Sequence, residues 1–196
     1  MDRKLYLFDF DGTLTTRDSL FDFLKFSFPS TYFKHYLFFI PLFFIAKLKI
    51  VDTGKVKERF ISSFLKGKSF VEINQLATRY FNENHPNLIH KEADKFIRSI
   101  SNYNDKFLVS ASLDIWLQPF ADYYQMGLIC TQAKYDENGF FTGKFATPNC
   151  NYEQKKYRIE KEVDLSLYDE VYAYGDTDGD KAMYALATQS FNQFFN

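Results

Sequence analysis

Two acidic motifs, each placed directly after a short apolar segment, constrain the fold of this 196-residue chain more than any other feature. The first motif is DFDGT at 9–13, after the apolar segment 3–8, and the second is GDTDGD at 175–180, after the segment 170–174. Short apolar segments that end in polar residues are typical of buried strands. The carboxyl ends of parallel strands meet at one edge of a sheet, so we expect the two motifs to lie together there.

The region between residues 17 and 101 has a helical pattern. Ser69 and Glu72 form a capping box that begins a helix, and His85-Pro86 predicts its end. Apolar residues at helical spacing predict helices over 56–65, 70–80 and 87–100.

Strands and helices alternate after residue 102. The pattern predicts strands at 107–109, 128–130, 170–174 and 190–195, and helices at 114–124, 155–163 and 178–188. Asn138-Gly139 predicts a hairpin with a type I′ turn. The predicted fold is α/β, a Rossmann-like, doubly wound, mostly parallel sheet with a helical cap inserted after the first strand. We assign residues 1–16 and 102–196 to the core domain and residues 17–101 to the helical cap domain.

Charge and cysteine content limit the partners and the compartment. Lys and Arg total 24 against 25 Asp and Glu, so no basic field exists to bind nucleic acid. Cys130 and Cys150 do not have metal-ligand spacing, and the apolar run before Asp9 is too short for a signal peptide. We therefore expect a cytoplasmic protein without a nucleic-acid partner.

The carboxylates of the two motifs would repel one another strongly at a shared sheet edge. Asp9, Asp11, Asp176 and Asp180 are hard oxygen donors, and Mg²⁺ is the usual ion that relieves such repulsion beside a phosphate. Taken alone, the first motif also suits a turn or a helix N-cap. The second also suits an acidic surface turn, or a calcium loop that lacks the terminal glutamate of an EF-hand.

Two residues between the motifs suit phosphate binding. Ser110 follows the predicted strand 107–109, and Lys155 begins a predicted helix. Singly, they are typical of a helix cap and a solvated charge. Together, a hydroxyl with backbone N–H groups at a helix N-terminus, and a lysine, could bind phosphate oxygens.

The segment 36–46 contains eleven residues without a charge, between Lys34-His35 and Lys47 with Lys49. It is too short to span a membrane, which takes about 20 apolar residues, and Pro41 is expected to interrupt it. Two interpretations remain open. The segment is either a buried helix pair of the cap or an interfacial element that contacts a membrane peripherally, with lysines at the lipid headgroups.

The motifs resemble those of the haloacid dehalogenase superfamily of phosphohydrolases, in the branch with a helical cap inserted after motif one. In the family's order, DFDGT at 9–13 resembles motif one, Val-Ser-Ala-Ser at 109–112 motif two, Lys155 motif three, and GDTDGD at 175–180 motif four. Tyr152 stands where relatives often have glycine.

The resemblance implies a role for each matching residue. Asp9 would be the nucleophile that forms an aspartyl-phosphate, and Asp11 the general acid and then the general base. Ser110, Ala111 and Lys155 would bind the phosphate. Asp9, the backbone carbonyl of Asp11 and Asp176 would ligate Mg²⁺, with Asp180 as a direct or water-mediated ligand, and Thr13 would orient the loop.

The resemblance therefore implies a Mg²⁺-dependent phosphatase acting on a small phosphomonoester. Asp18 and Arg59 are the nearest counterparts of the cap residues in phosphoserine phosphatases, which favours a soluble metabolite as substrate. The aromatic segment 36–46 instead resembles the cap of bacterial phosphatidylglycerophosphate phosphatases, which favours a lipid-linked substrate and a place at the inner face of a membrane. A phosphotransferase, or a membrane-associated module with a vestigial site, is a further alternative.

Overall fold

A five-stranded parallel sheet forms the centre of the protein, in the computed structural model that describes residues 3–48 and 50–195. Its strand order is β3-β2-β1-β6-β7, and every neighbouring pair is parallel. The strands are β1 (Lys4–Phe8), β2 (Asp105–Leu113), β3 (Gly127–Thr131), β6 (Glu170–Gly175) and β7 (Gln189–Asn192). The two motifs follow the central strand β1 and its neighbour β6, so the predicted doubly wound α/β fold is confirmed.

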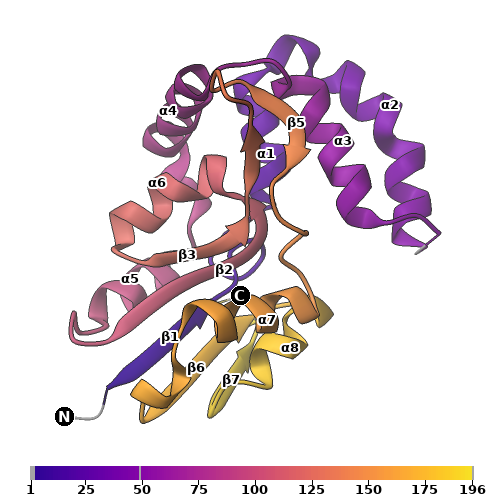
Figure 1. Cartoon of the computed structure of the whole chain (residues 1–196). Helices are drawn as coiled ribbons and strands as arrows, with labels where there is room; N and C mark the ends of the chain where they lie inside the picture. Colours follow the sequence, from indigo (N-terminus) through magenta and orange to yellow (C-terminus); the bar gives the residue numbers. More distant parts are fainter. Residues whose placement is uncertain (1–2, 49, 196) are drawn as a thin grey trace.

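Helices cover both faces of this sheet (Figure 1). Because side chains alternate along a strand, Leu5 and Leu7 point to one apolar cluster and Phe8 to the other. The first cluster lies beneath α7 (Glu153–Glu162) and α8 (Lys181–Tyr184). The second includes residues of α5 (Lys91–Ser99) and α6 (Asp114–Tyr124).

Four helices lie beyond the carboxyl ends of the strands, on one side of the molecule (Figure 1). They are α1 (Ser19–Ser27), α2 (Pro29–Lys47), α3 (Thr53–Leu65) and α4 (Phe70–Leu88). The hairpin of β4 (Ala133–Tyr135) and β5 (Phe141–Phe145) extends to them, and Gly67 N donates to Phe141 O at 2.9 Å. Helix α5 also falls within the predicted cap range, but its Phe96 packs on Phe8 of the sheet. The division into a core of 1–16 and 102–196 and a cap of 17–101 stays a prediction.

Proline does not end the helices where the sequence suggested. α2 continues through Pro41, and α4 continues through Pro86 to Leu88. A proline removes one backbone hydrogen bond, but α2 packs along α3 and α1, and Pro86 lies in the last turn of α4. The capping box of α4 is present as predicted. Because α4 ends at Leu88, the next helix, α5, begins at Lys91 and not at residue 87 as predicted.

Three other local predictions were wrong. The helix expected over 178–188 is a 3₁₀ turn at 178–180 followed by α8, which ends at Tyr184. Ser110 lies inside β2, which runs to Leu113, so it does not begin a helix. The hairpin turn is not type I′, because Gly139 has a positive φ and Asn138 does not. Asp136 instead closes a longer loop, with its N–H donating to Phe140 O.

In the described ranges 3–48 and 50–195, no helix is both long and apolar enough to cross a membrane.

Candidate active site

Asp9 lies where β1 ends and the first motif begins. Its N–H donates to Tyr174 O at 2.9 Å, which holds it beside the end of β6. The residue is only 7% exposed. Burial raises the pKa of Asp9 to about 7, although the positive charge of Lys155 acts in the opposite direction.

Lys155, in the first turn of α7, joins two of the carboxylates. Its Nζ donates to Asp9 Oδ1 and to Asp180 Oδ1, both at 2.5 Å, and the side chain is 2% exposed. Burial disfavours the charge, but the two carboxylates outweigh burial and raise the pKa of Lys155. The site therefore contains a fixed positive charge next to Asp9.

Tyr152 places α7 at the cost of backbone strain. Its φ of +50° and ψ of −129° form a combination that favours glycine. Gln154 N donates to Asn151 O at 3.0 Å across this turn, and Tyr152 N donates to Gly179 O at 3.1 Å. The tight turn thus connects the start of α7 to the second motif, and brings Lys155 to the carboxylates.

Asp180 organises the loop of the second motif. Its Oδ2 accepts hydrogen bonds from Asp176 N at 3.2 Å and Thr177 N at 3.1 Å, while Oδ1 accepts from Lys155. Gly175 gives it room, since a Cβ there would lie 2.6 Å from Asp180 Cγ. Both oxygens of this carboxylate are therefore occupied within the protein.

Thr13 and Gly12 hold the first motif against Asp176. Thr13 Oγ1 lies 3.3 Å from Asp9 Oδ2 and 3.4 Å from Asp176 Oδ1, in both cases as donor. Gly12 has a φ of +78°, and a Cβ there would lie 2.4 Å from Asp176 Oδ2. Only glycine allows this close approach. Burial and the charge of Asp180 raise the pKa of Asp176.

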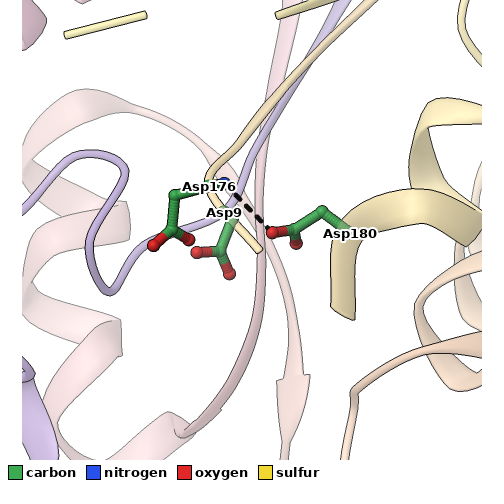
Figure 2. Close-up of side chains that lie close together, drawn as sticks. All are labelled: Asp9, Asp176 and Asp180. Carbon is green, nitrogen blue, oxygen red and sulfur yellow. Dashed lines mark hydrogen bonds between the residues drawn. The ribbon is translucent and has the colours of Figure 1, made fainter. Parts of the chain in front are cut away.

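Three carboxylates converge from the two motifs, as Figure 2 shows. One oxygen from each of Asp9, Asp176 and Asp180 lies within 4.8 Å of the others. The three carboxylates are hard oxygen donors, which suit Mg²⁺. Lys155 offsets only part of their negative charge, and the pKa values of Asp9 and Asp176 are raised. The structure thus brings together the three predicted side-chain ligands, whereas the fourth predicted ligand is the backbone carbonyl of Asp11.

The side chain of Asp11 does not join that group. Its Oδ1 accepts from Ser19 N at 2.6 Å, at the start of α1, and its Oδ2 accepts from Ser112 Oγ at 2.5 Å. Ser112, for which no role was predicted, lies in the segment 109–112 that resembles the family's motif two. These two hydrogen bonds hold the Asp11 carboxylate apart from Asp9.

Ser110 and Ala111 lie at the same sheet edge. The register Phe8↔Leu108 places Ser110 two residues beyond the paired position. The pairing with β3 jumps from Ser110↔Cys130 to Leu113↔Thr131, so a bulge sets the segment between them apart from the ladder. Ser110 Oγ accepts from Ser112 N at 3.1 Å, and its own hydroxyl hydrogen can turn toward a bound phosphate.

Lys57 of α3 reaches this segment, a contact that no local sequence signal indicates. Its Nζ donates to Ala111 O at 3.0 Å. Asp18 caps α1 by accepting from Leu20 N at 2.9 Å. The residue is exposed at the surface, but surrounding atoms desolvate its carboxyl group, and this desolvation together with the charge of Asp11 raises the pKa of Asp18 to about 6. Arg59, the other predicted cap residue, is exposed.

A cleft of about 680 Å³ separates the α2–α3 corner from the segment before α7. Ala46 and Ile50 line it on one side, and Asn149, Asn151 and Tyr152 on the other. Asp9, Asp176 and Asp180 do not line the cleft. It approaches Ala111, because Asn149 Oδ1 lies 3.4 Å from Thr131 Oγ1, which donates to Ala111 O.

The family is established by the sequence. The profile of the haloacid dehalogenase-like hydrolase family matches residues 6–185, and the chain belongs to this family of hydrolases. Protein CicA of Caulobacter vibrioides is 31% identical over 195 residues, which cover 97% of this chain and 86% of that protein. The predicted superfamily is therefore confirmed.

Solved structures share the fold at low sequence identity. A protein of unknown function from Bordetella pertussis Tohama I aligns with a TM-score of 0.82 and 21% identity, over 98% of this chain and 90% of that one. A phospho-aspartyl intermediate analogue of phosphoserine phosphatase aligns with a TM-score of 0.67 and 16% identity, over 98% and 87%. At these identities the likeness shows the fold alone.

Proposed function

We propose that this protein is a Mg²⁺-dependent phosphomonoester hydrolase in which Asp9 forms an aspartyl-phosphate. The arrangement of Asp9 and Asp11 supports this most directly. One carboxylate is buried beside Lys155, and the other is held apart by Ser19 and Ser112. The first is thereby available for attack on phosphorus and the second for proton transfer.

The two carboxylates divide the reaction into two displacements. In the first, an Asp9 oxygen bonds to phosphorus, the bond to the leaving oxygen breaks, and protonated Asp11 gives that oxygen its proton. In the second, Asp11 takes a proton from water, the water oxygen bonds to phosphorus, and the bond to Asp9 breaks. Inorganic phosphate is released, and both carboxylates return to their starting states.

The remaining residues bind the phosphate and the ion. Ser110, Ala111 and Lys155 would hold the phosphate oxygens. Asp9 and Asp176 would hold Mg²⁺, with Asp180 and the Asp11 backbone carbonyl as the other predicted ligands. When bound, the ion neutralises charge on the phosphate and the attacking carboxylate.

Two substrate classes follow from the cap. The exposed aromatic helix α2 favours a lipid-linked phosphomonoester. Lys57, which donates to Ala111 O, and Asp18, which interacts with Asp11 and Lys57, favour a phosphoserine phosphatase-like enzyme acting on a soluble metabolite. A phosphotransferase would use the same residues with an alcohol in place of water, whereas a vestigial site would give no turnover.

Variants of the two carboxylates test the proposal. Asp9→Asn should reduce turnover of an aryl phosphate to background. Asp11→Asn should lower turnover of alkyl phosphates by about 10² to 10⁴-fold, and less for aryl phosphates, whose leaving groups need no proton. Glu160→Gln, on the exposed side of α7, is the matched control and should keep full activity.

A substrate with a radiolabelled phosphoryl group distinguishes the covalent step from direct hydrolysis. When the reaction is quenched with acid during turnover, the wild-type protein should retain the labelled phosphoryl group, and Asp9→Asn should not. Full activity in Asp9→Asn would exclude the covalent mechanism. A screen that includes phosphoserine, sugar phosphates and phosphatidylglycerophosphate, with added alcohols as acceptors, separates the substrate classes and the transferase.

A further inference from the structure

The outer face of α2 is a continuous apolar surface. Phe33, Leu37, Ile40, Phe44 and Leu48 recur at three- to four-residue spacing and are 43% to 64% exposed. Phe38, beside this stripe, is 74% exposed. Exposed apolar patches of this extent are uncommon on monomeric proteins and indicate an interaction surface. We call these six residues the α2 face.

The opposite side of α2 packs against α3 and α1. Tyr32, Phe39 and Ala46 are buried, and Phe39 and Phe43 contact Phe60 of α3. The helix is therefore apolar on both sides, but only one side is covered by the protein. Leu42 is on the partly buried side. Helix α2 lies at the outer boundary of the molecule, away from the sheet (Figure 1).

Positive charge surrounds the α2 face. No acidic residue occurs between Asp22 and Asp52 in the sequence. Lys34 and Lys47, near the two ends of α2, are exposed, and Lys25 Nζ lies 5.9 Å from the ring centroid of Phe33. Lys49 adds a charge in the sequence but lies outside the described residues.

The nearest carboxylates in the chain on either side are already engaged. Asp22 pairs with Arg17 at 2.8 Å, and Asp52 caps α3 by accepting from Lys55 N at 2.8 Å. Among the described residues, Lys25, Lys34 and Lys47 form no ion pair. An apolar face beside such lysines matches an anionic lipid surface, in which acyl chains receive the apolar side chains and headgroups pair with the lysines.

A second copy of the chain fits this surface less well. A two-fold dimer would place the α2 face against itself, because such an interface uses the same patch on both subunits. Lysines of one helix would then approach lysines of the other, without a carboxylate on either helix to pair with them. Like charges opposed across an interface disfavour association.

We propose that the α2 face docks this protein on the surface of an anionic bilayer, with α2 lying in the plane of the headgroups. The last turn of α2 and the segment after it also form one wall of the cleft, through Ala46 and Ile50. Docking therefore brings the mouth of the cleft close to the headgroups. The docking does not depend on the proposed phosphatase chemistry, and binding is measured without turnover.

Sedimentation with vesicles tests the docking. The probes are vesicles of phosphatidylcholine alone and of equimolar phosphatidylcholine and phosphatidylglycerol, with protein in Mg²⁺-free buffer. The wild type should sediment with the anionic vesicles and much less with the neutral ones. Lys34→Gln with Lys47→Gln should weaken the partition coefficient by about 30-fold, from roughly 1 kcal/mol per lysine at the membrane surface.

Leu37→Asp and Phe44→Asp test the apolar contact. Each should lower the partition coefficient by at least about tenfold, since each removes a buried apolar side chain and adds a negative charge. Leu167→Asp is the matched control. Leu167 is 56% exposed, but it lies just before the amino end of β6 and is not part of the α2 face. Because Leu37 and Phe44 are exposed, the melting temperature should stay close to the wild-type value in both variants.

Three results would overturn the proposal. The first is equal sedimentation with neutral and anionic vesicles, or none with either. The second is unchanged binding in Leu37→Asp and Phe44→Asp. The third is a dimer in size-exclusion chromatography that Phe44→Asp converts to a monomer, which would assign the α2 face to a second copy. Phosphatase activity that survives any of these results would separate this failure from that of the proposed function.

Discussion

Replacing Lys155 with Met tests the electrostatic design of the site. In the structure its Nζ lies 2.5 Å from both Asp9 Oδ1 and Asp180 Oδ1, and the side chain is 2% exposed. Met retains the length of the side chain but leaves two buried carboxylates without their cation. Removing one partner of a buried ion pair costs about 3–5 kcal/mol. We expect a loss of this size in the free energy of unfolding when a chelator is present.

The loss should grow with pH. Burial already raises the pKa of Asp9 to about 7 beside Lys155, and without that cation the pKa rises further. A carboxyl group with a raised pKa binds more protons in the folded than in the unfolded state. The variant therefore loses stability as pH rises from about 4, its unfolded pKa, through the folded value.

Urea denaturation followed by far-UV circular dichroism, in EDTA, at about pH 5 and about pH 8, measures both effects. Lys161→Met, an exposed lysine on the same helix, is the control and should change the free energy of unfolding by less than about 0.5 kcal/mol. A cost for Lys155→Met below about 1 kcal/mol, or the same at both pH values, would refute the assignment of Lys155 as the buried counter-charge.

Three further predictions follow from the site. Activity should disappear in EDTA and return with Mg²⁺, which should stabilise the fold by about 2.7 kcal/mol at one hundred times its Kd, and Asp176→Ala should abolish this increment in thermal unfolding. Tyr152→Gly should increase the free energy of unfolding by about 1 kcal/mol by relieving the strain at φ +50°, whereas Tyr152→Ala, which keeps the positive φ, should give no such gain. Asp18→Asn should stabilise the metal-free protein by about 1 kcal/mol near pH 7, after screening of this exposed carboxylate. It should give no gain near pH 4, because the wild type loses stability as pH rises through the raised pKa of Asp18, about 6; a gain independent of pH would contradict that shift.

The sequence predicted the sheet because its signals are local. Segments such as 3–8 and 170–174 are apolar and end at acidic motifs, so strand type and strand end could be read together. The predicted ends of the helices were less accurate, because packing between helices determines where each helix ends. Pro41 would break an isolated helix, but contacts with α3 keep α2 continuous.

The site could be predicted only in part for a related reason. Asp9, Asp176 and Lys155 occur in motifs, so their convergence at one sheet edge could be expected. Lys57 has no such signal, because its contact with Ala111 O depends on how α3 is placed over β2. The direction of the Asp11 side chain likewise depends on Ser19 and Ser112, which are distant from each other in sequence.

The hydrogen bonds of Asp180 rank the two acidic residues of the second motif as metal ligands. Its Oδ2 caps the backbone N–H groups of Asp176 and Thr177, and its Oδ1 pairs with Lys155. A direct bond from Asp180 to an ion would require it to give up one of these partners. Asp176 Oδ1 accepts a hydrogen bond from Thr13 Oγ1 at 3.4 Å. Among the described residues, Lys155 pairs with Asp9 and Asp180 and not with Asp176. Asp176 is therefore better placed to bind the ion directly, while Asp180 holds the loop that presents it, and Asp180→Asn should weaken Mg²⁺ affinity less than Asp176→Asn does.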